Sequence, residues 1–228
     1  MNKRNLFILT ILVFISSYGK AQMYTIDNIY LPASSMEVGF YTDADKPKYI
    51  YYDIKNDDSH EKALARIPLS NIKSFITSLQ KAKVKYEEWS KVVEEEGSRI
   101  FTKNIPKLFI KDQTVFFTDG GKWYRENGVD MKGVFSVNNL GECFLVLQSD
   151  NMQSEELVGE SSMLGGSYTS KFNVGSIFGS SSQVTIKHYC SGASLTFRSS
   201  NEIDAFIEKL KNVLDWKNKQ NSRNKKFK

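Results

Sequence analysis

The chain has 228 residues, 40% of them hydrophobic and 13% aromatic, with a formal net charge of +5. This composition supports one ordinary folded domain or two small ones and excludes a chain that is disordered throughout. Basic residues concentrate at the two ends, with three before residue 22 and six in the last 12 residues, which leaves 22 bases and 26 acids between them. A mildly acidic body argues against a nucleic-acid-binding fold, so no nucleic acid is expected as a partner.

The first 21 residues have the features of a cleaved secretory signal peptide. Two basic residues precede an uncharged apolar run from Leu6 to Ile15, and small residues occupy the −3 and −1 positions of a cut after Ala21. The apolar run is about half of the ~20 residues that a membrane-spanning helix needs, which makes a retained anchor the weaker alternative. Gln22 follows the cut, so a Cys for lipid attachment is lacking there. We expect an exported protein, periplasmic or extracellular, with no transmembrane span after cleavage.

Strands are expected at the start of the body. Runs rich in β-branched and aromatic residues predict strands over 23–31, 36–41 and 48–54, with a turn over 43–47. Alternation in the third strand places two tyrosines, Tyr49 and Tyr51, on one face. The residues between and after them then lie on the opposite face: Ile50, Tyr52 and Ile54.

A long amphipathic helix is predicted over 70–96. Ser70 is a good N-cap residue, and Gly97 stands where helices commonly end. The apolar residues recur at steps of three and four: Ile72, Phe75, Ile76, Leu79, Ala82, Tyr86, Trp89 and Val93. One face must therefore be buried, either against a sheet or against a partner, and the latter would make the protein a partner-dependent subunit.

Turn residues after position 107 predict an antiparallel meander. Residues 119–121 (Asp-Gly-Gly) separate strands over 114–118 and 122–125, and residues 138–141 separate strands over 134–137 and 142–148. Ser191-Gly192 separates strands over 184–190 and 193–197. Strands joined by such tight turns run antiparallel.

A second helix is predicted over 200–216, and its pattern echoes the first. Ile72-x-x-Phe75-Ile76-x-x-Leu79 matches Ile203-x-x-Phe206-Ile207-x-x-Leu210. Two similar halves, 22–97 and 98–216, would explain the match, and so would coincidence, because any sheet-covering helix has this pattern. The expected fold class is α+β, an antiparallel meander covered by the helices 70–96 and 200–216, as one domain over 22–216 or as two subdomains.

Two segments outside the regular elements are candidates for interaction. The basic residues 217–228 are expected to be a disordered tail, either a solubilising end or a segment attracted to an anionic surface. The Gly/Ser-rich residues 159–182 form either a flexible excursion or a loop that binds a partner such as another envelope protein.

Six residues are candidate ligand-binding residues, because exposed aromatic and apolar side chains stack on sugars or fill a partner's pockets. They are Tyr168, Phe172, Ile177 and Phe178 in the 159–182 segment, with Trp123 and Tyr124 in the 122–125 strand. Packing in the core is the alternative explanation for each aromatic residue.

Motifs for familiar catalytic and metal-binding chemistry are missing from the sequence. It has no Gly-x-Ser-x-Gly elbow, no glycine-rich nucleotide motif and no Cys-x-x-Cys or His-x-x-x-His pair. His188 and Cys190 share one face of a predicted strand, yet neighbours on one strand stand parallel rather than converge on a substrate. We therefore assign no catalytic residue, no metal ligand and no cofactor.

Cys143 and Cys190 are the two cysteines of the chain. They could form one disulfide in an oxidising compartment, or remain as small buried residues in apolar strands.

The sequence therefore predicts a non-enzymatic, exported binding or structural protein of the cell envelope. The alternative is a hydrolase that acts on an envelope polymer through carboxylates that the fold brings together.

Overall fold

The computed structural model describes residues 23–43, 48–58, 61–97, 100–157 and 185–226. The chain divides into two compact units: a main unit of Met23–Ser154 with His188–Lys228, and a second unit of Met1–Gln22 with Glu155–Lys187. Every site considered below lies in the main unit. The predictions for residues 1–21 and 159–182, including Tyr168, Phe172, Ile177 and Phe178, lie outside the described residues.

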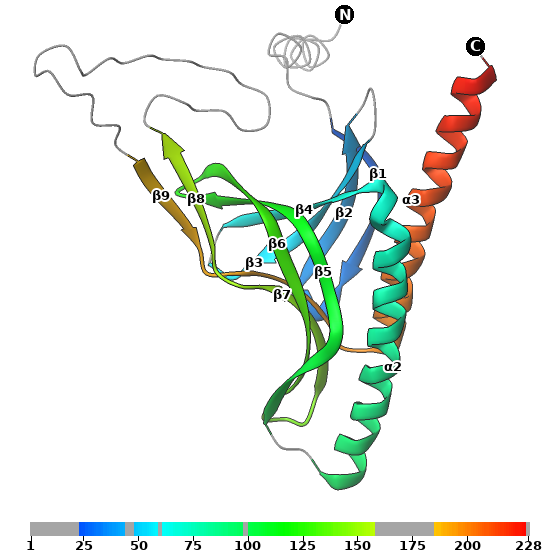
Figure 1. Cartoon of the computed structure of the whole chain (residues 1–228). Coiled ribbons are helices and arrows are strands. Elements are labelled where there is room, and N and C mark those ends of the chain that lie inside the picture. Colours follow the sequence, from blue (N-terminus) through cyan, green and yellow to red (C-terminus); the bar gives the residue numbers. More distant parts are fainter. Residues whose placement is uncertain (1–22, 44–47, 59–60, 98–99, 158–184, 227–228) are drawn as a thin grey trace, which may run out of the picture. The chain divides into compact units, whose positions relative to one another are not determined.

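The main unit is built on one antiparallel sheet. Its eight strands are β1 (Met23–Leu31), β2 (Met36–Asp43), β3 (Tyr49–Asn56), β4 (Lys62–Pro68), β5 (Phe101–Asp119), β6 (Lys122–Val137), β7 (Cys143–Ser149) and β10 (Ala193–Phe197). Their order in the sheet is β1-β2-β3-β10-β7-β6-β5-β4, and β4 also pairs with β3. Six strands, β3, β10, β7, β6, β5 and β4, therefore close into a barrel, from which the β1–β2 hairpin extends (Figure 1).

Strand β3 closes the barrel because it has neighbours on both edges. One edge pairs with β4 from Tyr49 to Lys55. The other edge is shared, with β2 opposite Tyr51 and Tyr52 and β10 opposite Lys55 and Asn56. The α+β class and the antiparallel pairing are as predicted, whereas the closure of the sheet was not predicted.

Two helices cover the inner side of this sheet. Helix α2 (Ile72–Glu96) follows the 3-10 turn η2 (Leu69–Asn71) and packs on β5 and β7. Helix α3 (Ser200–Lys226) packs on β1, on β10 and on α2, and Figure 1 shows the two helices side by side. The apolar stripe of α2 is thus covered within the chain itself, which removes the reason to expect a partner on that stripe.

An aromatic cluster joins the helices to the strands. The ring of Phe206 on α3, which is completely buried, lies 5.3–6.2 Å from four other rings. These are Phe40 of β2, Tyr52 of β3, Phe75 of α2 and Phe197 of β10. Tyr52 and Ile54 face this core, so by alternation Tyr49, Tyr51 and Asp53 lie on the opposite face of the sheet, where Tyr51 is nevertheless only 6% exposed.

The predicted hairpin over 184–190 and 193–197 is wrong. Strand β10 pairs with β3 and β7, whereas β9 (Thr185–Cys190) pairs with β8 (Met152–Leu157) in a separate two-stranded sheet. The Gly192 carbonyl accepts a hydrogen bond from the Asp57 N–H at 2.9 Å, so the short turn joins two sheets rather than two paired strands.

Two further expectations differ from the structure. Helix α3 continues to Lys226, so the residues expected to be disordered from 217 onward extend the helix. Lys, Arg and Gln favour helix, and extending an existing helix costs little compared with nucleating one. In addition, β3 and β4 pair with β10 and β5, so the segments 22–97 and 98–216 share one sheet and are not separate subdomains.

Candidate functional site

An open groove of about 670 Å³ lies on the outer face of the sheet. Residues of β1, β2, β3 and β4 line it, together with the 3-10 turn η1 (Pro32–Ser34) and the start of β6. Its outward-facing side chains include Thr25, Glu37, Tyr41, Asp53, Lys55, Lys62, Leu64 and Trp123. The volume is within the range of small-ligand sites, and the lining mixes aromatic, charged and hydroxyl groups.

Asp53 fixes the position of Tyr41 in this groove. Its Oδ2 atom accepts hydrogen bonds from the Tyr41 hydroxyl at 2.7 Å and from the Gly39 N–H at 2.8 Å. The Tyr41 ring lies so close over β2 that a Cβ on Gly39 would stand 2.2 Å from the Tyr41 hydroxyl oxygen. A glycine inside a strand often marks such a close approach, so Gly39 is the sequence signal that could have located this feature.

The Tyr41 phenol stays protonated at neutral pH. Burial and the hydrogen bond to the Asp53 carboxylate both raise the pKa of Tyr41 far above its ordinary value. The side chain of Tyr41 is therefore neutral, and its hydroxyl donates its hydrogen to Asp53.

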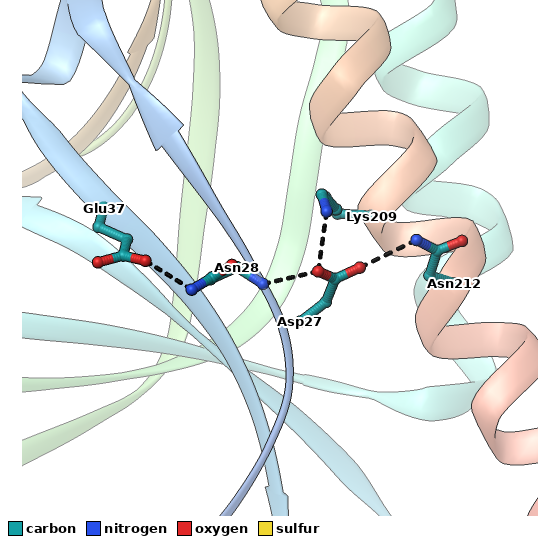
Figure 2. A network of polar contacts seen from close by, with 5 residues as sticks. All are labelled: Asp27, Asn28, Glu37, Lys209 and Asn212. Carbon is teal, nitrogen blue, oxygen red and sulfur yellow. Dashed lines mark hydrogen bonds and ion pairs between the residues drawn. The ribbon is translucent and has the colours of Figure 1, made fainter.

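A polar network fastens the outer hairpin to helix α3 (Figure 2). A bulge at Ile26 shifts the register of β1, and the Asp27 carboxylate accepts from Lys209 Nζ at 2.8 Å and from Asn212 Nδ2 at 2.9 Å. Burial opposes the charge of Asp27, but the hydrogen bonds from Lys209, Asn212 and the Asn28 N–H outweigh it and lower the pKa of Asp27.

The same network reaches the groove. Asn28 follows Asp27 in β1 and its Nδ2 donates to Glu37 Oε1 at 2.5 Å. Glu37 lines the groove, so its position depends on a strand that α3 holds in place. Hydrogen bonds thus connect Glu37 in the groove to helix α3 on the opposite face of the sheet, through Asn28 and Asp27.

A second polar cluster lies near the turns that connect β3 to β4, β5 to β6 and β9 to β10. His188 Nδ1 lies 3.1 Å from Asp119 Oδ2, and its ring stacks on Tyr124 with centroids 3.7 Å apart. Ser191 donates from its hydroxyl and its N–H to Asp58, and these bonds lower the pKa of Asp58. The cluster attaches the end of β9 to the barrel.

The two aromatic candidates of β6 have different environments. Trp123 is half-buried and lines the groove. Tyr124 is 6% exposed and packs between the rings of Phe117 and His188, so it belongs to the interior. Alternation along the strand accounts for this division, since neighbouring residues point to opposite faces.

His188 and Cys190 have separate hydrogen-bond partners. The Cys190 sulfur lies 3.3 Å from Asn56 Oδ1 and 3.1 Å from the Gly192 carbonyl oxygen, while His188 contacts Asp119. Burial raises the pKa of the Cys190 thiol to about 11, so the thiolate that nucleophilic catalysis needs is scarce at neutral pH.

Cys143, which is half-buried, and Cys190, which is buried, are both free thiols in this structure. Cys143 is the first residue of β7, and Ser149 at the other end of β7 is the residue that reaches Ala193, next to the turn after Cys190. The length of a strand therefore separates the two sulfurs.

Two features are absent from the described residues. Among them, no group of three or more His, Cys, Asp or Glu side chains is placed to hold a metal ion. No helix in the described ranges combines the length and the apolar character needed to cross a membrane.

Comparison with known proteins adds no relative. No protein-family model matches the chain, and neither a curated protein nor a solved structure does.

Proposed function

We propose that the protein is an exported, non-enzymatic binding protein of the cell envelope that holds its ligand in the outer groove. The observation that carries the proposal is the fixed position of Tyr41, which Asp53 holds over Gly39 in a groove that also contains Trp123. A wall that is ordered before the ligand arrives lowers the entropic cost of binding. The proposal of export rests on the features of the first 21 residues.

The composition of the groove favours a glycan as the ligand. Trp123 and Tyr41 offer aromatic surface, while Glu37, Lys55 and Lys62 offer charged hydrogen-bonding groups along an open channel. A sugar chain has apolar C–H faces that stack on aromatic rings and hydroxyls that bond to charged groups. The groove is open to solvent, which also suits a segment of a polymer.

The test is direct binding of soluble envelope glycans to the purified protein, followed by calorimetry. We expect Trp123→Ala to weaken binding about five- to tenfold, because a stacked aromatic ring contributes on the order of 1 kcal/mol. Trp216→Ala is the matched control, since Trp216 lies on α3 and does not line the groove. Equal affinities of the Trp123→Ala variant and the unaltered protein would contradict the proposal.

The hydrolase alternative has one observation in its favour, because three carboxylates, Glu37, Asp53 and Glu61, line the same groove. Two of them already accept hydrogen bonds within the protein, Asp53 from Tyr41 and Gly39, and Glu37 from Asn28. Release of reducing ends from a bound glycan would decide between the proposals. Turnover that Asp53→Asn or Glu61→Gln abolishes would establish the hydrolase, and binding without turnover would support the binding protein.

A further inference from the structure

Arg66 lies on the same outer face as the groove, one step along the sheet from it. In the strand register, Arg66 of β4 stands between Tyr51 of β3 and Thr114 of β5. Two residues away on the same face, Leu64 and its β3 partner Asp53 line the groove. A ligand that lies in the groove and extends along β4 therefore meets Arg66 next.

Two aromatic rings lie close to the guanidinium of Arg66. Its central carbon lies 4.3 Å from the ring centroid of Tyr49 and 5.5 Å from that of Phe116. One nitrogen donates to Thr114 Oγ1 at 2.8 Å, and that hydroxyl in turn donates to Asn127 Oδ1 at 3.0 Å. Stacking on two rings and one hydrogen bond leave the side chain little freedom to rotate.

The charge of Arg66 has no acidic partner in the described part of the chain. The ion pairs found there involve lysines and His188, and the contacts of Arg66 are the two rings and the Thr114 hydroxyl. A guanidinium has five N–H donors, and within the described residues the Arg66 side chain donates one of them, to the Thr114 hydroxyl. A half-buried cation without a counter-ion is costly, and a bound anion reduces that cost.

We propose that Arg66 binds an oxyanion, a carboxylate or a phosphate, that the ligand of the groove carries. The inference rests on the proposed function and narrows it, because the ligand becomes an acidic glycan. The planar fork of a guanidinium matches the two oxygens of either group, and a fork that is already oriented loses little entropy on binding. Tyr49, whose ring centroid lies 4.3 Å from the central carbon of the guanidinium, places an aromatic ring beside the proposed anion.

Two matched pairs of probes test the inference and separate the two sources of charge. One pair is oligogalacturonate and its neutral methyl ester, and the other is a phosphate-bearing mannan oligosaccharide and its dephosphorylated form. We expect the protein to bind at least one acidic form at least about tenfold more tightly than its neutral partner, since charge-assisted bonds to a guanidinium are strong. The pair that shows the preference identifies the anion.

Three variants locate the preference. Arg66→Met keeps the apolar stem and should reduce the acidic-to-neutral ratio to below about threefold, with the affinity for the neutral form unchanged. Arg66→Lys keeps the charge without the planar fork and should give an intermediate ratio. Arg198→Met removes an equal charge from the exposed residue before α3 and should retain the ratio of the unaltered protein.

Each of the other possible outcomes contradicts either the role of Arg66 or the glycan proposal. The acidic and neutral forms could bind equally tightly, with Trp123→Ala abolishing the binding of both. This result would overturn the role of Arg66 and leave the groove as the binding site. An equal loss of both forms in Arg66→Met would show that Arg66 only supports the sheet. Binding of neither member of either pair would overturn the glycan proposal together with this inference. Should Arg66→Met fail to fold, the Arg66→Lys ratio decides, because a ratio equal to that of the unaltered protein excludes the fork.

Discussion

Ser34 serves as a strand partner for Thr196. The Ser34 hydroxyl accepts a hydrogen bond from the Thr196 N–H at 2.9 Å and donates one to the Thr196 carbonyl at 3.1 Å. Strands β2 and β10 share one edge of β3 and do not follow each other in the sheet order, so the edge of β10 at Thr196 needs another partner. A single side chain from η1 supplies both the acceptor and the donor, and it also lines the groove.

We predict that Ser34→Ala destabilises the protein by about 2 kcal/mol, because two partly buried backbone groups of Thr196 lose their partner. Ser34 is only 5% exposed, so water cannot easily replace the hydroxyl. Urea unfolding measures the change in the free energy of unfolding. Ser70→Ala is the control, since Ser70 is exposed and bonds only to the side chain of Asn71. Equal stabilities of the two variants would contradict the role of Ser34.

Gly39→Ala is expected to displace the Tyr41 ring and to break its hydrogen bond to Asp53. The added Cβ would stand 2.2 Å from the Tyr41 hydroxyl oxygen, so the ring must move outward. We expect a loss of about 1.5–3 kcal/mol in the free energy of unfolding, the value of a hydrogen bond to a charged group. A double-mutant cycle provides the control, because in a Tyr41→Ala background the same change should cost less than about 0.5 kcal/mol. Equal costs in both backgrounds would refute the proposed contact.

The two thiols are expected to differ in reactivity. Burial raises the pKa of Cys190 to about 11, whereas Cys143 is only partly buried. In the native Cys143→Ser variant, labelling of Cys190 by a thiol reagent at pH 7.4 should be at least about tenfold slower than in the denatured chain. The unreduced protein should show two thiols after denaturation. Rapid native labelling of Cys190, or the absence of free thiols, would contradict the structure.

Asp27 is expected to stabilise the protein at neutral pH and not at strongly acidic pH. Its pKa is lowered below the ordinary value of 3.8 in the folded protein, so folding favours the ionised form. The contribution is therefore complete above the ordinary pKa and is lost as the pH falls through the lowered one. Asp27→Asn should cost about 1 kcal/mol at pH 6, because the ion pair with Lys209 is partly exposed, and progressively less below pH 4.

The comparison variant for this pH dependence is Asp204→Asn. Asp204 also pairs with a lysine, Lys83, but its side chain is 55% exposed. We expect Asp204→Asn to lower the free energy of unfolding less than Asp27→Asn does at pH 6, because exposed ion pairs contribute little. A pH-independent cost of Asp27→Asn would show that the network of Figure 2 stabilises the protein through packing rather than charge.

Local patterns in the sequence predicted much of the secondary structure. The apolar steps of three and four predicted α2 and the first part of α3, and the turn residues predicted the hairpins β5–β6 and β6–β7. Alternation also placed Tyr52 on the same face as Ile50 and Ile54, and in the structure this is the core face. Strand β4 was missed because its sequence, Lys-Ala-Leu-Ala-Arg-Ile-Pro, is rich in residues that are depleted in strands.

The groove and the surroundings of Arg66 depend on contacts between residues far apart in the sequence, which a local sequence pattern cannot predict. Tyr41 and Asp53 could not be paired in advance, because the pairing of β2 with β3 involves only a short part of each strand. Arg66 meets Tyr49 and Phe116 only because β4 lies between β3 and β5. Among the residues of the groove, Trp123 was predicted from the sequence as a ligand-binding residue. Gly39, a glycine inside a strand, was a signal that this prediction did not use.

The sequence by itself thus determined the class of the fold, the buried faces of the two helices and which side chains of the strand over 48–54 share a face. These properties follow from periodicity and turn chemistry within a few residues. Only the tertiary structure decided that β3 closes the barrel and that β10 pairs with β3 rather than with β9. Alternation specifies which side chains of a strand share a face, but it does not specify which strand pairs with which. The pairing depends on how much apolar surface the complete fold buries.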